Sequence, residues 1–158
     1  MVSIGDKEFR AKESLKWLGV YIDSRLTFKE HVTRKTIDAS RVFHQIERLS
    51  NTERGLSFQA MRQLYIACVS SIADYGVPIW WNGQKGFLDK FQKLQNQALR
   101  KILGTFKTSP IRAMEVEASI APPIVRINKI CRSYVLRSIE FINHYAIKKR
   151  LPRTFFLN

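Results

Sequence analysis

The sequence predicts a mainly α-helical protein, an antiparallel bundle of about four to five helices with a short N-terminal β-hairpin. After residue 27, apolar residues recur at three- and four-residue steps over most of the chain. Glycine and proline stand at the ends of these periodic segments, as is typical of helix boundaries. The connections between the segments are short, which favours antiparallel neighbours. Before residue 27 the chain instead carries β-branched and aromatic residues.

The β-tolerant part of the chain consists of two segments, residues 7–10 and 15–22, separated by the polar turn at residues 11–14. Trp17, Val20 and Tyr21 supply the aromatic and β-branched side chains. A hairpin of two strands is marginal in water. We therefore expect it to lie on another surface, inside the chain or outside it.

The first two helices are expected at residues 28–49 and 57–75. Thr27 and Glu30 fit a capping box at the start of the first helix. Gly76 and Pro78 follow the second helix, and residues 79–81 form a short apolar plug. The polar break at residues 51–55 separates the two helices.

Three further helices are expected at residues 87–103, 109–118 and 123–145. Gly104 ends the first of them, and Ser109 with Pro110 opens the second as N-cap and first helical residue. The last helix is predicted to turn its apolar stripe inward, a stripe formed by Ile124, Ile127, Ile130, Cys131, Tyr134, Phe141, Ile142 and Tyr145. The chain thus divides into a hairpin (1–26), a two-helix unit (27–77), a helical connector (78–147) and a basic tail or linker (148–158).

The charge is strongly positive. The chain has 27 lysines and arginines against 13 acidic residues, a net charge of +14. Residues 119–158 carry eight of these basic residues and only one acidic residue, Glu140. Such a field attracts polyanions, and nucleic acid is the first partner that it suggests. An acidic protein or a membrane surface would suit the same charge.

The residue pattern offers no catalytic or metal site. No two acidic residues are adjacent. Glu115 and Glu117 are two residues apart, so a helix would point their side chains to different faces. His31, His44 and His144 lack the spacing of zinc ligands, and we expect satisfied or exposed imidazoles. Cys68 and Cys131 lie on apolar stripes, which favours buried inert thiols in a reducing compartment. We therefore expect no cofactor, no metal and no activity of the isolated chain.

Basic residues form stripes on three of the predicted helices, each away from the apolar stripe of its helix. The predicted nucleic-acid-binding residues are Arg34, Lys35, Arg41, Arg48, Lys90, Lys93, Arg100, Lys101, Arg126, Lys129, Arg132 and Arg137. Contacts from such residues to phosphates position a nucleic acid without reading its sequence. Ordinary solvated faces of amphipathic helices would give the same pattern.

Several sequence words resemble the reverse transcriptases of non-LTR, LINE-like retrotransposons. Residues 15–23 contain Leu18-Gly19-Val20, and residues 26–32 read Leu-Thr-Phe-Lys-Glu-His-Val. Residues 75–80 match a Tyr-Gly-x-x-x-Trp element of the family. Residues 94–110 are similar to its Gln-Asn-x-Ala-Leu-Arg passage, and the run after Lys101 looks most like elements of filamentous fungi. The resemblance covers residues 15–137.

This resemblance implies the region that follows the catalytic palm: primer grip, thumb and connector. Trp17, Leu18, Gly19 and Val20 would form a primer-grip-like strand tip, residues 27–77 a thumb-like unit, and the basic helices a clamp on a template–primer duplex. The family's Tyr-x-Asp-Asp metal-binding motif is missing from this chain. Phosphoryl transfer requires metal ions held by carboxylates. The resemblance therefore implies part of an RNA-directed DNA polymerase that does not polymerise alone.

Two other functions fit the same residues. The chain can be read as a stand-alone basic helical module that binds nucleic acid, or as a protein-interaction module that uses the hairpin edge and Trp80-Trp81. The partners expected for a fragment of a reverse transcriptase are an RNA–DNA hybrid or duplex, bound without sequence preference, and the palm and fingers of that enzyme. We expect no membrane partner. The N-terminus does not resemble a signal peptide, so an intracellular location in cytoplasm or nucleus is expected.

Overall fold

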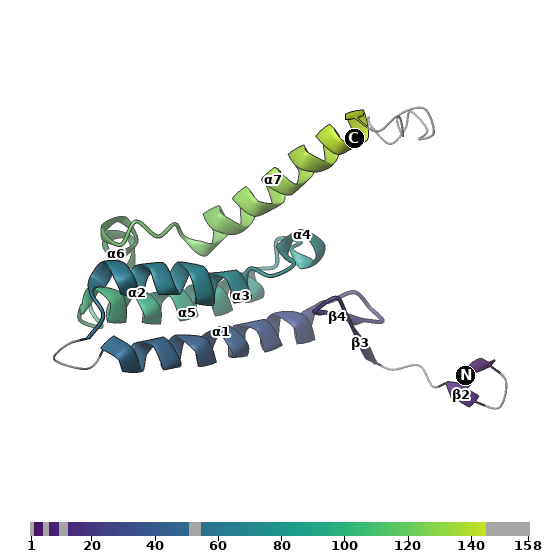
Figure 1. The fold of residues 1–158 in the computed structure, drawn as a ribbon, viewed down its shortest axis with the longest axis horizontal. Helices are drawn as coiled ribbons and strands as arrows, with labels where there is room; N and C mark the ends of the chain where they lie inside the picture. Colours follow the sequence, from purple (N-terminus) through teal and green to yellow (C-terminus); the bar gives the residue numbers. More distant parts are fainter. Residues whose placement is uncertain (1, 5–6, 10–12, 51–54, 145–158) are drawn as a thin grey trace.

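The computed structural model describes residues 2–4, 7–9, 13–50 and 55–144 (Figure 1). It confirms the predicted class, because the described chain is mainly helical and a short antiparallel hairpin precedes the helices. The predicted division into four segments stays a prediction, and the basic tail at residues 148–158 lies outside the described residues.

The described strands form two separate antiparallel pairs. Strand β1 (Val2–Ile4) pairs with β2 (Lys7–Phe9), and β3 (Ser14–Trp17) pairs with β4 (Val20–Asp23). The prediction of one strand across residues 15–22 was therefore wrong. Leu18 and Gly19 both have positive φ, 46° and 81°, as two-residue hairpin turns of the primed types require. Glycine at the second position makes this turn accessible, and it folds the segment back on itself.

Helix α1 (Lys29–Ser50) begins under a side-chain cap from the hairpin. Asp23 accepts hydrogen bonds from the Thr27 amide (3.0 Å), the Thr27 hydroxyl (2.8 Å) and the Phe28 amide (2.8 Å). Desolvation opposes the carboxylate, but these hydrogen bonds outweigh it and lower the pKa of Asp23 to about 2. Glu30, expected in a capping box, instead pairs with Arg34 at 2.7 Å. The hairpin and the first helix are thus joined through Asp23.

The second predicted helix is divided. It consists of α2 (Phe58–Leu64), a π-helical turn η1 (Tyr65–Ser70) and α3 (Ser71–Ala73). The hydroxyl of Ser70 donates to the Ile66 carbonyl at 2.7 Å, and such back-bonding accompanies local distortion of helices. The predicted apolar plug is the short helix α4 (Val77–Trp80), which follows Gly76 in the left-handed region.

Helix α5 (Lys85–Leu103) is the central helix of the core. It contacts α1, α2, α6 (Ile111–Glu117) and α7 (Pro123–His144). Gly104 caps it with φ 64°, as predicted. Trp80 stacks on Phe91 with ring centroids 5.7 Å apart, so α4 is packed directly onto α5.

Helix α7 diverges from the rest of the bundle toward its C-terminal end (Figure 1). Ile127 is buried, and Ile130 and Cys131 pack against the core as predicted. Tyr134 and Phe141 were also expected to face inward, but both are exposed. The stripe continues along the helix beyond the point where the other helices can cover it. Ile142 and Tyr145 fall outside the residues whose side chains are described.

Candidate nucleic-acid interface

The β3–β4 hairpin is attached to the helices by Tyr75 and His31. The Tyr75 hydroxyl donates to the Leu18 carbonyl at 2.7 Å, across the turn of the hairpin. His31 is fully buried, and its Nδ1 accepts from the Tyr21 amide at 3.3 Å while Nε2 lies 3.1 Å from the Tyr75 carbonyl. An accepting Nδ1 places the proton of the neutral ring on Nε2, which donates to Tyr75. Burial lowers the pKa of His31 and favours this neutral form.

Two glycines allow the hairpin to approach this closely. A Cβ on Gly19 would lie 3.1 Å from Cε1 of Tyr75, and one on Gly76 would lie 3.2 Å from Cγ2 of Val20. The indole Nε1 of Trp80 donates to the same Tyr75 carbonyl at 2.9 Å. The sequence motifs that contain Gly19, His31 and Tyr75 are far apart in the chain, but these three residues lie together in the structure. Sequence reasoning placed His31 at a polar or boundary position and did not find this anchor, although the words that form it were visible.

The predicted primer-grip-like residues divide into an exposed and a packed pair. Trp17 and Leu18 are 63% and 79% exposed, at the end of the hairpin. Val20 is buried, and Gly19 packs against the Tyr75 ring. Of these four residues, only Trp17 and Leu18 are therefore available to contact another molecule. Gly19 is explained by the turn and by Tyr75, without an approach of a primer.

The helices that carry the first two predicted basic stripes, α1 and α5, lie side by side. Nζ of Lys90 donates to Oγ1 of Thr33 at 2.9 Å, and Nζ of Lys101 pairs with Glu47 at 2.7 Å. These two contacts join α5 to α1 near both ends of the helices. We call this the α1–α5 surface, and its basic members are Arg34, Arg41, Arg48, Lys90, Lys93, Arg100 and Lys101.

Some cations of the α1–α5 surface have exposed carboxylate partners. Arg34 pairs with Glu30 and lies over the Tyr21 ring at 4.6 Å, and Arg41 pairs with Asp38 at 3.5 Å. Exposed pairs of this kind contribute about 0–1 kcal/mol, so a phosphate can compete for the cation. Arg48 and Lys93 have no ion pair among the residues that the structure describes. The surface therefore keeps its positive character.

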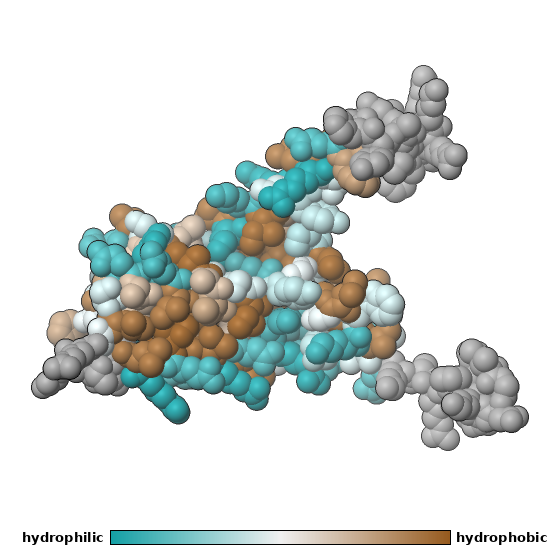
Figure 2. Space-filling view, in the orientation of Figure 1, coloured by the Kyte–Doolittle hydropathy of each residue, from teal (hydrophilic) through white to brown (hydrophobic). Residues whose placement is uncertain are grey.

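The exposed face of α1 is mixed in character (Figure 2). The lower edge of the molecule in this view is largely hydrophilic. Arg34, Arg41 and Arg48 of α1 are exposed. Apolar side chains gather over α1 and α2 in the same view. Leu49 of α1, Phe58 of α2 and Ile66 of η1 are among the exposed apolar residues. Lys35, predicted with the arginines, lies apart from them with its Nζ 4.4 Å from the centre of the Tyr75 ring. Lys35 therefore belongs beside the hairpin anchor.

The third predicted stripe is separate from the other two. Helix α7 packs on α4 and α5, and its distal half points away from α1 (Figure 1). Lys129, Arg132 and Arg137 are exposed along this helix. The three stripes therefore do not form one continuous clamp.

The guanidinium of Arg126 is bound to buried side chains of the protein and is not free to contact a ligand. Its Nε and Nη2 donate to the two carboxylate oxygens of Asp74, the latter at 3.1 Å, and its Nη1 donates to Oε1 of Gln95 at 2.7 Å. The side chains of Arg126 and Asp74 are only 19% and 9% exposed. Burial opposes both charges, while the hydrogen bonds to Asp74 raise the pKa of Arg126. Arg126 was expected to bind nucleic acid, but the structure engages it in a buried bridge between α7 and the residue that caps the end of α3.

Acidic and metal-binding side chains do not gather in the described part of the chain. No group of three or more His, Cys, Asp or Glu residues there is arranged to hold a metal ion. Among the same residues, no helix has the length and apolar character needed to cross a lipid bilayer.

The chain is similar to parts of two curated polymerases from Drosophila melanogaster. It is 36% identical over 87 residues to a probable RNA-directed DNA polymerase from transposon BS, which covers 55% of this chain and 10% of that protein. It is 24% identical over 151 residues to the RNA-directed DNA polymerase from mobile element jockey, which covers 93% of this chain and 16% of that protein. No family model and no solved structure matches the chain. The chain is thus related to a region of retrotransposon RNA-directed DNA polymerases and spans about a tenth to a sixth of their length.

Proposed function

We propose that this chain is a non-catalytic part of a retrotransposon reverse transcriptase, which follows the palm and holds the template–primer duplex through its backbone. The similarity to the BS and jockey polymerases supports the general assignment. The placement after the palm rests on the sequence words and on the missing metal-binding motif. The fungal origin suggested by the run after Lys101 stays a prediction.

The observation that carries this proposal is the joining of α1 and α5 through Lys90–Thr33 and Lys101–Glu47. Two parallel rows of cations can contact phosphates of both strands of a duplex. An RNA–DNA hybrid is close to A-form, with a wide and shallow minor groove that proteins recognise by shape and backbone. A surface of flexible lysines and arginines suits such recognition, since phosphate contacts do not depend on base sequence.

The hairpin gives the proposal a direction along the duplex. Trp17 and Leu18 are exposed at the end of the hairpin that precedes α1. We place the primer end on this side, with the duplex extending along α1 toward Arg48. The exposed Leu15, on the same strand as Trp17, is proposed to face the palm of the larger polymerase.

The experiment measures fluorescence anisotropy of a labelled RNA–DNA hybrid at several salt concentrations, beside duplex DNA and single-stranded RNA. If three to five phosphates are neutralised, log K falls against log salt with a slope of about −3 to −4. We expect tighter binding of the hybrid than of the other two nucleic acids. A slope near zero would contradict the proposal and favour a protein-interaction module.

Matched charge reversals test which surface binds. The triple variant Arg34→Glu, Arg41→Glu and Arg48→Glu is expected to weaken hybrid binding strongly. The control triple Lys129→Glu, Arg132→Glu and Arg137→Glu makes the same change in net charge on α7. Equal losses in both variants would show that only the net charge matters and would exclude the α1–α5 surface as the specific site.

A further inference from the structure

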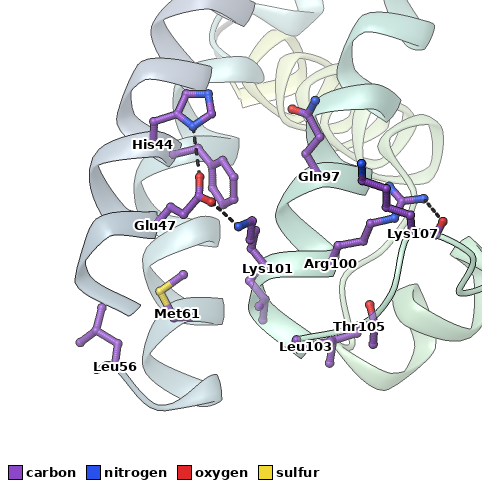
Figure 3. A pocket seen from close by; sticks show the side chains of 13 residues that line it. His44, Glu47, Leu56, Met61, Gln97, Arg100, Lys101, Leu103, Thr105 and Lys107 are labelled. Carbon is purple, nitrogen blue, oxygen red and sulfur yellow. Dashed lines mark hydrogen bonds and ion pairs between the residues drawn. The ribbon is translucent and has the colours of Figure 1, made fainter. Parts of the chain in front are cut away.

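The α1–α5 surface ends in an open groove of about 1140 Å³ (Figure 3). Its walls are the C-terminal half of α1, the approach to α2 and the end of α5 with residues 104–107. We call it the α1–α5 groove, and its volume is ample for a ligand of nucleotide size.

The charges of the groove favour an anion. Among the described residues that line the groove, Glu47 is the one carboxylate, beside the cations Arg100, Lys101 and Lys107. Glu47 pairs with Lys101 at 2.7 Å and lies 3.1 Å from Nδ1 of His44. The hydrogen bond from Lys101 lowers the pKa of Glu47, so this carboxylate is ionised and engaged. Arg100 and Lys107 are left without a carboxylate among the lining residues.

The guanidinium of Arg100 is fixed by backbone acceptors. Nη1 donates to the Asn96 carbonyl at 3.2 Å, and Nη2 donates to the Lys107 carbonyl at 3.3 Å. These contacts hold the loop after α5 against the helix and place Lys107 beside Arg100 (Figure 3). Because carbonyls are neutral, the full positive charge remains for a ligand. A cation held in advance loses little conformational freedom when an anion binds.

The rest of the lining is suited to a planar, partly apolar group. Leu56 and Met61 supply apolar atoms from one wall of the groove and Leu103 from the end of α5 (Figure 3). Gln97, His44 and Thr105 supply polar atoms that can donate or accept hydrogen bonds. An anionic ligand with an apolar face and hydrogen-bonding edges satisfies both parts, and a nucleotide combines these features.

We propose that the α1–α5 groove binds an unpaired nucleotide at the single-stranded end of the nucleic acid. Its phosphate contacts Arg100 and Lys107, and its base lies on Leu56 and Leu103. This inference rests on the proposed function, because it places the duplex on the α1–α5 surface next to the groove. Unpaired bases can enter a groove that a base pair cannot, since their edges and faces are free.

The test compares a blunt RNA–DNA hybrid with the same hybrid carrying a short single-stranded overhang, by fluorescence anisotropy with the full chain. We expect the overhang to tighten binding by about tenfold, which corresponds to about 1.4 kcal/mol. Lys107→Glu is expected to abolish this preference. Lys93→Glu is the matched control, because it reverses one charge on α5 outside the groove and weakens both oligonucleotides alike.

The outcomes separate this inference from the proposed function. Equal affinity for blunt and overhanging hybrids, with blunt binding intact, would overturn the groove assignment alone. An overhang preference that Lys107→Glu leaves unchanged would overturn it too, because the strand would then lie elsewhere. Absence of binding by either oligonucleotide would refute the proposed function itself. Circular dichroism of each variant shows that the fold is retained.

Discussion

The backbone carbonyl of Tyr75 accepts hydrogen bonds from two buried rings, Nε2 of His31 at 3.1 Å and Nε1 of Trp80 at 2.9 Å. The side-chain hydroxyl of Tyr75 donates to the Leu18 carbonyl at 2.7 Å. A single residue, 57 positions after Leu18, therefore ties the hairpin, α1 and α4 together. Two isolated strands would be marginal in water, and this anchor supplies the surface that they need.

Removal of the Tyr75 hydroxyl should loosen the hairpin. Tyr75→Phe keeps the ring and deletes one hydrogen bond, which is typically worth about 0.5–1.5 kcal/mol. We expect a loss of this size in urea unfolding and faster amide exchange in residues 14–23. Tyr134→Phe is the control, because the exposed Tyr134 has no hydroxyl hydrogen bond among the described residues. Equal effects of the two variants would contradict the role of Tyr75.

Stability should fall in mildly acidic solution because of His31. Burial lowers its pKa in the folded state, so the unfolded chain binds the proton more readily. The contribution is complete above the unfolded pKa of about 6.5 and is lost as pH falls from there toward the folded value. Protonation would also turn Nδ1 from the acceptor of the Tyr21 amide into a donor.

The measurement is the free energy of unfolding at about pH 7.5 and about pH 5.5, on either side of the ordinary histidine pKa. We expect His31→Gln to reduce the difference between the two values. Gln45→Ala changes an exposed side chain of the same helix that carries no titratable group, and it should leave the difference unchanged. A pH dependence that persists in full in His31→Gln would contradict the assignment.

Two glycines should respond in opposite directions to alanine. Gly76 has φ 70°, and a Cβ there would lie 3.2 Å from Val20, so Gly76→Ala is expected to cost about 1–2 kcal/mol. Gly86 lies inside α5 with open space around a Cβ. Gly86→Ala should therefore stabilise the protein by about 0.5–1 kcal/mol. Thermal unfolding of both variants checks the prediction, and a stabilising Gly76→Ala would refute the close packing of the hairpin.

The Asp74–Arg126 bridge should matter for stability rather than for binding. Arg126→Met leaves a buried carboxylate without its partner, and we expect a loss of about 3 kcal/mol. Arg132→Met, on the exposed side of the same helix, should change stability by about 0.5 kcal/mol or less. Denaturant unfolding of the two variants measures the contrast. Similar values would mean that Arg126 is not the bridge described here.

Individual charges on the α1–α5 surface should affect the salt dependence of binding. The double variant Arg48→Glu and Lys93→Glu is expected to weaken hybrid binding and to make the salt slope shallower by about 2, since about two phosphate contacts are lost. Arg132→Glu with Arg137→Glu is the control with the same net charge. The slopes come from anisotropy titrations, and a steeper loss in the α7 control would redirect the proposal to that helix.

Local residue patterns were sufficient to predict the helical class and most helix positions. Apolar periodicity reflects burial on one side of a helix, and that signal is local. Gly104 and Gly76 marked helix ends because the left-handed conformation there favours glycine. A hairpin was expected between residues 7–10 and 15–22, but the chain forms separate pairs within residues 2–9 and 14–23. The turn at Leu18-Gly19 was missed because strand-forming residues stand on both sides of it. The short motifs shared with reverse transcriptases indicated the relatives, because such motifs can be recognised from the order of residues alone.

Which basic residues are exposed and which are bound to acidic partners depends on the tertiary structure. Arg126 and Arg132 occupy the same predicted stripe, yet one is bound to Asp74 and the other is exposed. The neighbourhood of α1 and α5, which brings Lys90 to Thr33, joins residues 57 positions apart. His31 became buried because the hairpin folds over it. These outcomes depend on which helices pack together. Helix packing depends on the combined contacts of many side chains that are far apart in the sequence, so a local pattern does not reveal it.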